Sequence, residues 1–384
     1  MADPVAGVNP TVLKWARERS GYSIEEAAEL AGKRVDVLLK WEAGDAAPTY
    51  VQLEKLAYKI YKRPIALFFF PQPPEEPEPS QEFRTLPDFE IDDLRPDTRL
   101  KVRQALALQI SLSELSNGKN PSERLITREL AIDPSRAPAV AARQTREFLN
   151  LPVSIQTSWK TMDEALKEWR AAVEAVGVFV FKDTFKQREI SGFSLFDDEF
   201  PLIYVNNSTA KSRQIFTILH ELGHLLVHTG GVTLRDDTYI KALHGDERRI
   251  EVFCNAFAAQ VLLPDSEFKK EDLSADDQNL LRLARRYKVS REVILRRLLE
   301  MDRVSAKKYS EKASQWAQDY FDASIGEGGD YYFTQATYLS DRYMRMAFAK
   351  YYQGTISLDQ LASYLNMKAA NVPGLERIVV ERFR

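Results

Sequence analysis

The sequence predicts a mostly helical α+β protein with a helical N-terminal domain, a middle domain that contains a small sheet, and a helical C-terminal domain. Apolar residues recur at helical spacing through residues 9–70 and through most of 275–384. Short apolar runs typical of strands are confined to residues 177–205. A proline-rich stretch separates the first helices from the rest of the chain, so we expect distinct domains.

The chain has 384 residues, which at about 150 residues per domain favours two or three domains. Its single cysteine, Cys254, excludes a disulfide within the chain and indicates a reducing compartment. The sequence shows no secretory signal, and no apolar run approaches the ~20 residues of a membrane span. We therefore expect a cytoplasmic protein without a membrane partner. The net charge of −3 argues against non-specific coating of nucleic acid.

Residues 9–70 are expected to form five short helices. Ser23 is a favourable N-cap for the second helix, and Glu26 three residues later completes a capping box. Gly32 is expected to end that helix, and Gly44 to end the next one. The pattern predicts a small helical domain at the N-terminus.

Residues 71–82 contain five prolines and no bulky apolar residue, which predicts a stiff, extended, acidic linker. This change of composition is the clearest domain boundary in the sequence. The expected division is a domain at 1–70, a linker at 71–83, a helical connecting segment at 84–160, a sheet-containing domain at 161–300 and a helical domain of unknown role at 301–384.

The expected sheet combines a buried strand at 177–181 with a β-hairpin, whose strands at 190–196 and 201–205 flank Asp197-Asp198-Glu199. Helices are expected before and after these strands, at 162–176, 209–227 and 249–263. Gly230-Gly231 is expected to end the second of them. A break at Gly326-Gly328-Gly329 is expected to interrupt the C-terminal helices.

His220, Glu221 and His224 form an HExxH motif within the helix expected at 209–227. Histidines four residues apart lie on one helix face, about 6 Å apart along the axis. Their imidazoles can share one Zn²⁺, which lowers the pKa of a bound water, and Glu221 can accept the proton of that water. The alternative interpretation is two core histidines with satisfied hydrogen bonds on an amphipathic helix.

A zinc site of this kind needs a third protein ligand. A metzincin would carry Gly at position 227 and His at position 230, whereas this chain has Val227 and Gly230. His228 lies about 12 Å from His220 along the helix, so it is expected near the site as a supporting or pocket group and not as a ligand. His244, in an expected loop, stays an alternative ligand.

Glu251 is the favoured third ligand, because it follows His224 by 27 residues, enough for a loop and a returning helix. Two histidines from one helix and a glutamate from another form a thermolysin-like ligand set. The alternative is a solvated helix charge, but Phe253 and Phe257 follow in the same helix and indicate a buried face. Asn255, four residues after Glu251, is expected to orient a ligand histidine.

Four other residues have two interpretations each. Cys254 is either a soft ligand or redox switch, or a small buried residue, which is the commoner role of a free cysteine. Lys211, Arg213 and Tyr204 are either substrate contacts or ordinary surface and core residues.

Several motifs around the HExxH sequence occur in a recognisable order: Ser191-Gly192-Phe193, Ile203-Tyr204-Val205-Asn206-Asn207, Arg213-Gln214-Ile215-Phe216-Thr217, and Glu251 with Cys254-Asn255-Ala256-Phe257-Ala258-Ala259 and Leu262-Leu263-Pro264. Together they resemble the ImmA/IrrE metallopeptidase family over about residues 160–300. The resemblance implies a zincin-like, mostly helical domain with one zinc, held by His220, His224 and Glu251, and with Glu221 as the catalytic base. It also implies cleavage of a transcriptional repressor during stress or phage induction. Cys254 stands where alanine is usual in the family, a departure that leaves the ligands intact.

The N-terminal helices resemble a Cro/repressor-type (XRE-type) helix-turn-helix domain, on the motifs Ser23-Ile24-Glu25-Glu26-Ala27-Ala28, Leu39-Lys40-Trp41-Glu42-Ala43-Gly44, Pro48-Thr49 and Phe68-Phe69. In that fold the helix after the Gly32 turn enters the major groove of double-stranded DNA. The residues then expected to face DNA are Lys33, Arg34, Asp36 and Lys40. Residues 9–70 carry ten Lys/Arg against eight Asp/Glu, a weak electrostatic footprint, so a helical module that binds another protein is the alternative.

These expectations combine into a DNA-binding zinc endopeptidase that cuts a partner protein, either a repressor or a toxin–antitoxin partner. A homodimer is among the assemblies that the sequence leaves open. The alternative is a regulator or antitoxin-like partner whose peptidase-like domain grips a protein with little or no turnover. A DNA-binding protein with a purely structural zinc is disfavoured, because closed structural sites usually have four protein ligands.

Overall fold

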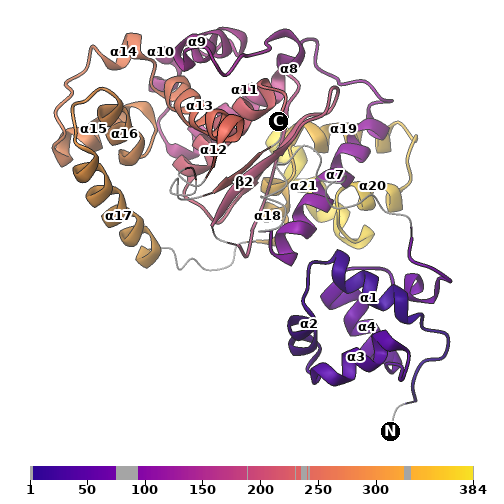
Figure 1. The fold of residues 1–384 in the computed structure, drawn as a ribbon. Coiled ribbons are helices and arrows are strands. Elements are labelled where there is room, and N and C mark those ends of the chain that lie inside the picture. Colours follow the sequence, from indigo (N-terminus) through magenta and orange to yellow (C-terminus); the bar gives the residue numbers. More distant parts are fainter. Residues whose placement is uncertain are drawn as a thin grey trace. The chain divides into compact units, whose positions relative to one another are not determined.

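The computed structural model describes residues 3–74, 94–187, 189–229, 231–234, 240, 243–323 and 330–383. The chain divides into two compact units, Met1–Gln104 and Ala105–Arg384 (Figure 1). The mostly helical α+β fold expected from the sequence is confirmed. Among the described residues, no helix combines the length and the apolar character that crossing a membrane requires.

The N-terminal unit contains the five short helices expected from the sequence. They are α1 (Pro10–Arg19), α2 (Ile24–Ala31), α3 (Val35–Ala43), α4 (Tyr50–Glu54) with its π-helical continuation η1 (Lys55–Tyr61), and the 3-10 helix η2 (Ile65–Phe69). Ser23 and Glu26 form the predicted capping box. Gly32 and Gly44 take the left-handed conformation that ends α2 and α3.

A continuous apolar core holds this small unit together. Val12, Leu53 and Phe68, from three different helices, are completely buried in it. Arg17 fixes α1 against α3 because its guanidinium donates two hydrogen bonds to the Glu42 carboxylate, at 2.8 and 3.0 Å. The proposed linker begins at the end of this core, and its residues 75–83 lie outside the described residues.

The second unit begins within α7 (Pro96–Leu115), which starts in the first unit. Its next elements are α8 (Ile126–Glu129), α9 (Pro138–Phe148), α10 (Val153–Ser158), α11 (Met162–Ala175), β1 (Phe179–Asp183), β2 (Ile190–Leu195), β3 (Leu202–Asn206), α12 (Lys211–Leu226), β4 (Gly231–Leu234) and α13 (Gly245–Leu262). Then follow α14 (Asp265–Phe268), α15 (Asp277–Tyr287), α16 (Arg291–Glu300), α17 (Ala306–Ala323), α18 (Tyr331–Tyr338), α19 (Asp341–Tyr352), α20 (Leu358–Tyr364), the 3-10 turn η4 (Ala369–Asn371) and α21 (Val372–Phe383). The predicted break at Gly326-Gly328-Gly329 lies outside the described residues.

The sheet has four strands in the order β1-β3-β2-β4. The predicted hairpin is confirmed, because β2 and β3 pair antiparallel, with Phe193 opposite Tyr204. β1 pairs parallel with β3, with Asp183 opposite Asn206, so both strands end at the same edge. The edge strand β4, which pairs antiparallel with β2, was not predicted. It is only four residues long, too short for a clear alternating pattern.

One face of the sheet packs on α11 and α12, and α13 packs on α12 (Figure 1). Val180 and Val205 point into this core, where they meet Trp169 of α11 and Leu222 of α12. Residues of α8 and α9, which belong to the proposed connecting segment, are buried in the same core. The domain limits drawn from the sequence stay predictions.

The other face of the sheet carries aromatic rings and meets the C-terminal helices. Phe193 stacks on Tyr204 with 5.2 Å between ring centroids, and Phe181 makes an edge contact with Tyr343 of α19 at 5.4 Å. Arg170 of α11 donates a hydrogen bond to the Thr337 carbonyl of α18 at 2.9 Å. The C-terminal helices are therefore packed directly on the sheet.

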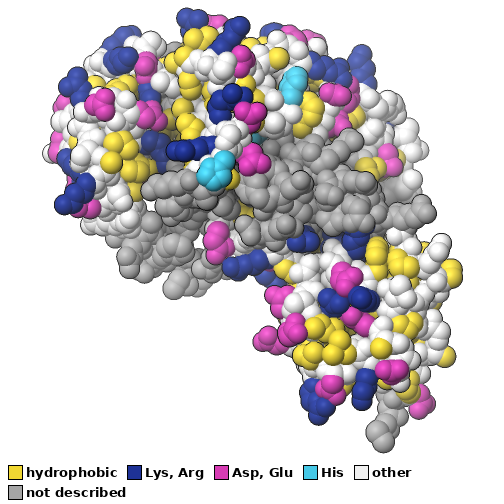
Figure 2. All heavy atoms as spheres, viewed as in Figure 1, with side chains coloured by type: hydrophobic (Ala, Val, Ile, Leu, Met, Phe, Trp, Pro, Cys, Tyr) yellow, Lys and Arg dark blue, Asp and Glu magenta, His cyan; other side chains and the backbone are white. Residues whose placement is uncertain are grey.

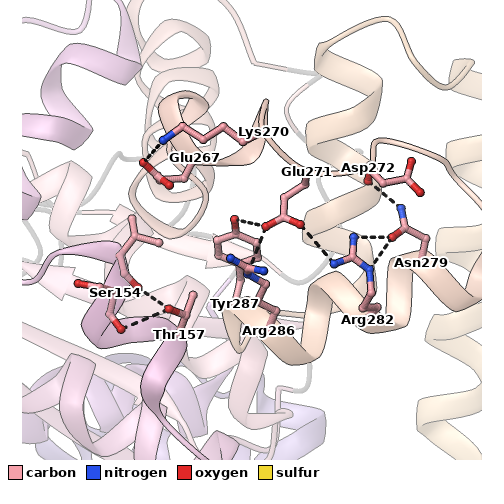
Figure 3. Close-up of polar contacts among 11 residues, drawn as sticks. Ser154, Thr157, Glu267, Lys270, Glu271, Asp272, Asn279, Arg282, Arg286 and Tyr287 are labelled. Carbon is pink, nitrogen blue, oxygen red and sulfur yellow. Dashed lines mark hydrogen bonds and ion pairs between the residues drawn. The ribbon is translucent and has the colours of Figure 1, made fainter.

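A polar network ties the turn after α14 to α15 (Figure 3). Glu271 accepts a hydrogen bond from the Tyr287 hydroxyl at 2.9 Å and pairs with Arg282 and Arg286 at 3.3 and 3.2 Å. The side-chain oxygen of Asn279 accepts hydrogen bonds from Nε and Nη2 of Arg282, at 3.0 and 2.8 Å. This network and the buried Tyr287 hold α15 in place.

Candidate metal centre

The helix α12 positions the HExxH motif in the middle of the second unit. From Gln214 to Leu226 every one of its residues is buried, which is the pattern of a central helix covered on several sides. His220 is completely buried and His224 is 2% exposed. Because they are one turn apart, both imidazoles project from the same face of α12 toward α13.

Three potential ligand atoms meet between α12 and α13. The Nε2 atoms of His220 and His224 are 3.0 Å apart. The Glu251 carboxylate reaches both, with Oε1 at 2.8 Å from His224 Nε2 and Oε2 at 3.4 Å from His220 Nε2. Among the described residues, these three form the one group of His, Cys, Asp or Glu side chains that could hold a metal ion.

These distances fit a tetrahedral metal ion. Zinc bonds of 2.0–2.1 Å place the ligand atoms of a tetrahedron about 3.3 Å apart. The three separations here range from 2.8 to 3.4 Å, close to that value, and the described residues supply three ligands, one fewer than a tetrahedral ion takes. Two buried imidazole nitrogens facing each other and a buried carboxylate also need a common cation to balance them. The residues present therefore fit a metal.

The protonation preferences of the site suit metal binding. Burial alone would raise the pKa of the Glu251 carboxyl, but the His224 and His220 imidazoles outweigh it and hold this pKa well below its ordinary value. Burial opposes the charged form of His224, yet the neighbouring Cys254 and Glu251 raise the pKa of its imidazole well above the ordinary value. Glu251 is thus ready to bind as an anion, and His224 must release a proton when a metal binds.

Glu221 lies next to this cluster and is completely buried. Its carboxylate oxygen Oε2 accepts a hydrogen bond of 2.6 Å from the Ser194 hydroxyl of β2. Sequence reasoning missed Ser194, because the contact joins a strand to a helix and no spacing in the sequence reveals it. The available signal was a small polar residue inside a strand whose residues are all buried.

Asn255 of α13 lies beside His220. Its Oδ1 is 3.1 Å from His220 Nδ1, on the side of the ring opposite to Nε2. An amide oxygen there selects the tautomer with hydrogen on Nδ1, which leaves Nε2 free to bind a metal. Asn255 is four residues after Glu251 on α13, so one helix face presents both groups to His220.

Gly223 and Gly192 permit the close packing on which this arrangement depends. A side chain at Gly223 would meet Phe257 of α13 at 3.0 Å and Cys254 at 3.2 Å. A side chain at Gly192 of β2 would meet Thr217 of α12 at 2.6 Å. Cys254 is completely buried at the contact of the two helices.

The structure separates two other histidines from the centre. The expectation that His228 continues the helical ladder differs from the structure, because α12 ends at Leu226 and His228 has the positive φ of 59°. Its Nε2 lies 3.0 Å from the Thr127 carbonyl, and its ring packs on Phe196. His244 is the residue before α13 and does not belong to the cluster of potential ligands in the described part of the chain.

The residues considered for substrate contacts have structural partners. Lys211 pairs with Asp163 at 2.5 Å, and Arg213 Nε donates to the Ser191 hydroxyl at 3.2 Å. Tyr204 is buried in the aromatic face of the sheet. Their role toward a substrate stays a prediction.

The residues expected to face DNA lie at the exposed N-terminal end of α3 and along it. Lys33, Arg34 and Lys40 are exposed, and Arg34 pairs with Asp36 at 2.6 Å. The Arg34 guanidinium lowers the pKa of the Asp36 carboxyl through this hydrogen bond. Figure 2 shows acidic and basic side chains interspersed over the N-terminal unit, which agrees with its nearly balanced charge.

Comparisons with known proteins match two separate parts of the chain. Residues 173–299 match the family described as the IrrE N-terminal-like domain, and residues 13–57 match a helix-turn-helix family. Over 113 residues the chain is 33% identical to the radiation response metalloprotease IrrE of Deinococcus radiodurans. This match covers 27% of the chain and 33% of the relative, so the chain spans about a third of that relative's length.

The second unit therefore contains a metallopeptidase-type domain built around a His-His-Glu cluster. Residues 173–299 thus form an ImmA/IrrE-type domain, and an XRE-type helix-turn-helix domain precedes it in the same chain.

Proposed function

We propose that this protein is a zinc metalloendopeptidase that cleaves a partner protein, a transcriptional repressor, in the cytoplasm. The observation that carries the proposal is the convergence of His220, His224 and Glu251 beside the buried carboxylate of Glu221. Two imidazoles and one carboxylate at these distances suit zinc, and three protein ligands suit a catalytic site more than a structural site, which usually has four.

In the proposed reaction His220, His224 and Glu251 hold the zinc. When bound, zinc supplies a Lewis acid that polarises the scissile carbonyl and lowers the pKa of water. Glu221 accepts the proton of the attacking water on its carboxylate and passes it to the amine that leaves when the C–N bond breaks. Ser194 holds Oε2 of Glu221 by its 2.6 Å hydrogen bond, which directs the other oxygen, Oε1, toward the reacting water. Asn255 orients His220 through Nδ1.

The N-terminal unit supports a regulator as the substrate. A helix-turn-helix domain in the same chain would bring the peptidase to DNA, where repressors are bound. Lys33, Arg34 and Lys40 would contact phosphates and base edges of double-stranded DNA, and Asp36 would restrain Arg34. We place this cleavage in stress responses or in the control of phages and other mobile elements, on the likeness to IrrE. A homodimer would match two half-sites of an operator.

The direct test is Glu221→Gln in the full chain. We expect the variant to retain zinc and fold, and to cleave a captured partner roughly 10²–10⁴ times more slowly, as expected for loss of a general base. The same variant should trap its substrate uncut in a pull-down. Glu168→Gln, an exposed glutamate of α11, is the matched control. Cleavage at the full rate by Glu221→Gln would show that Glu221 is not the general base.

The burial of the site favours a second candidate function. Glu221 is 0% exposed and Glu251 is 3% exposed, so the conformation described presents little of the centre to a polypeptide. A regulator or antitoxin-like protein that grips its partner without turnover would need no open cleft. A stable, uncut complex between the wild-type chain and the partner trapped by Glu221→Gln would favour this candidate over the peptidase.

A further inference from the structure

A cavity of about 600 Å³ lies in the second unit, at the first turn of α12. Because β1 and β3 run parallel and end together, Lys182 of β1 and Asn207 after β3 meet at this edge. Asp163 of α11 and Lys211, Ser212 and Gln214 of α12 complete the polar lining. Ligands of α/β proteins commonly bind at the carboxyl ends of parallel strands, and the volume is that of a small-molecule site.

Lys182 is the unusual residue of this cavity. It lies on the same face of β1 as Val180, directed toward α11 and α12, and it is only 6% exposed. In the described part of the chain, its ammonium makes no hydrogen bond and no ion pair. Burial, together with the nearby charges of Arg170 and Lys211, lowers the pKa of Lys182 to about 7, and Asp163 opposes this only weakly. A buried ammonium without a partner is costly unless a ligand pairs with it.

The first turn of α12 offers further donors to the same space. The residue before the helix is Ala210, whose side chain cannot cap it, and the first turn contains no acidic residue. The backbone N–H groups of Lys211 and Ser212 have no acceptor among the described residues. Free N–H groups and the helix dipole at the N-terminus of a 16-residue helix favour an anion.

The charges around the cavity agree with an anionic ligand. Asp163 is engaged by Lys211 at 2.5 Å, so these two charges compensate each other. The charge of Lys182 then has no counterion in the cavity. Gln214 adds a buried amide oxygen without a hydrogen-bond partner, which suits a ligand that also carries a hydroxyl or N–H group.

We propose that this cavity binds a small molecule through a phosphate group, which pairs with the Lys182 ammonium and accepts hydrogen bonds from the N–H groups of Lys211 and Ser212. His220 is nine residues after Lys211 on the same helix, about 14 Å along its axis. The ligand would thus fix the first turn of the helix that carries the metal centre, without contacting the centre itself.

Inorganic phosphate is the probe for this site. The full chain would be titrated with phosphate at constant ionic strength and at a pH about one unit below the Lys182 pKa of about 7, where most of this side chain is charged, while the melting temperature is followed. We expect a saturable rise for the wild type. Lys182→Met should weaken phosphate binding about tenfold or more, the effect of losing a charge-assisted hydrogen bond. Lys167→Met, at an exposed position of α11, should behave as the wild type does.

Two outcomes would overturn the proposal. One is the absence of any saturable rise in the wild type, and the other is an equal rise in Lys182→Met, which would place the phosphate elsewhere, for example on the metal. Lys182→Met without phosphate should melt at the same or a higher temperature than the wild type, because it removes a buried charge. If that variant does not fold, Lys211→Met at the rim carries the test. It should weaken phosphate binding several-fold, and unchanged binding would contradict the proposal.

Discussion

The metal centre and the exposed face of α3 are built in opposite ways. At the centre, His220, Glu221 and Glu251 are at most 3% exposed, and each is held by groups from other elements. On the exposed face of α3 and in the turn before it, Lys33 and Lys40 are exposed, and an ion pair joins Arg34 to Asp36, two residues of the same segment.

This difference determines what each region can tell us. Buried polar groups must satisfy one another, so their geometry reports a chemistry even without a ligand. Exposed charges are solvated whether or not they have a function, so their positions report little until DNA is bound. At the centre, individual atoms therefore indicate a chemistry, whereas on α3 only the helix-turn-helix match indicates DNA binding.

The largest effect is expected when His224 is replaced and the variant is compared with a replacement of His228, near the end of α12. His224→Ala removes one of three ligands, so we expect loss of bound zinc and of all measurable peptidase activity. His228→Ala is the matched control, because His228 contacts the Thr127 carbonyl and Phe196 instead of the centre. Metal content and cleavage rate are measured for both variants. Loss of metal from His228→Ala would show that His228 supports the metal centre.

A smaller effect is expected from Ser194→Ala, which leaves the ligands in place. Without its 2.6 Å hydrogen bond, the Glu221 carboxylate can rotate, and we expect cleavage to slow roughly 10–100-fold with zinc retained. Ser191→Ala, a buried serine of the same strand that faces Arg213, should leave both the cleavage rate and the zinc content unchanged.

The buried Lys182 and the exposed Lys40 are expected to affect the free energy of unfolding differently. The pKa of Lys182 is lowered to about 7 in the folded protein, against its ordinary value of 10.5. Between these values the unfolded chain binds more protons than the folded chain, so the free energy of unfolding rises with pH. We expect Lys182→Met to stabilise the protein by roughly 1–3 kcal/mol below pH 7 and by progressively less toward pH 10.5.

Denaturant unfolding at several pH values measures this effect. Lys40→Met, at the exposed lysine of α3, should change stability little at any pH. A pH-independent gain for Lys182→Met would show that the buried ammonium is not the cause.

The smallest expected effect concerns Asp36 on the exposed face. Asp36→Asn removes a negative charge next to DNA and releases Arg34 from its pair, so we expect DNA affinity to rise several-fold at low salt and less at high salt. Asp45→Asn makes the same change of charge at an exposed position after α3. If both variants bind DNA equally well, release of Arg34 has no part in the gain.

Local sequence signals predicted most of the fold. The capping box at Ser23, the glycine stops of α2 and α3, the β2–β3 hairpin and the helices that carry HExxH and Glu251 all depend on short-range patterns. The strand β4 was not predicted, because a four-residue edge strand is defined by its pairing with β2 and not by its own composition.

At the candidate site, too, short-range patterns were predictable and tertiary contacts were not. Helical spacing was enough to bring His220 and His224 together, and Asn255 follows Glu251 by one turn. Ser194 and Lys182 escaped detection because their roles come from tertiary packing of strands against α12. His228 differed from expectation because α12 ends two residues earlier, with His228 in a left-handed conformation that sequence spacing does not reveal.

X-ray absorption at the zinc edge of the purified full chain tests the central claim most directly. We predict one zinc per chain, with nitrogen and oxygen scatterers at about 2.0–2.1 Å and no sulfur, and with the oxygen contribution reduced in Glu251→Ala. A sulfur scatterer at about 2.3 Å would make Cys254 a ligand. That result, or carefully purified protein without any bound transition metal, would contradict the His220–His224–Glu251 centre.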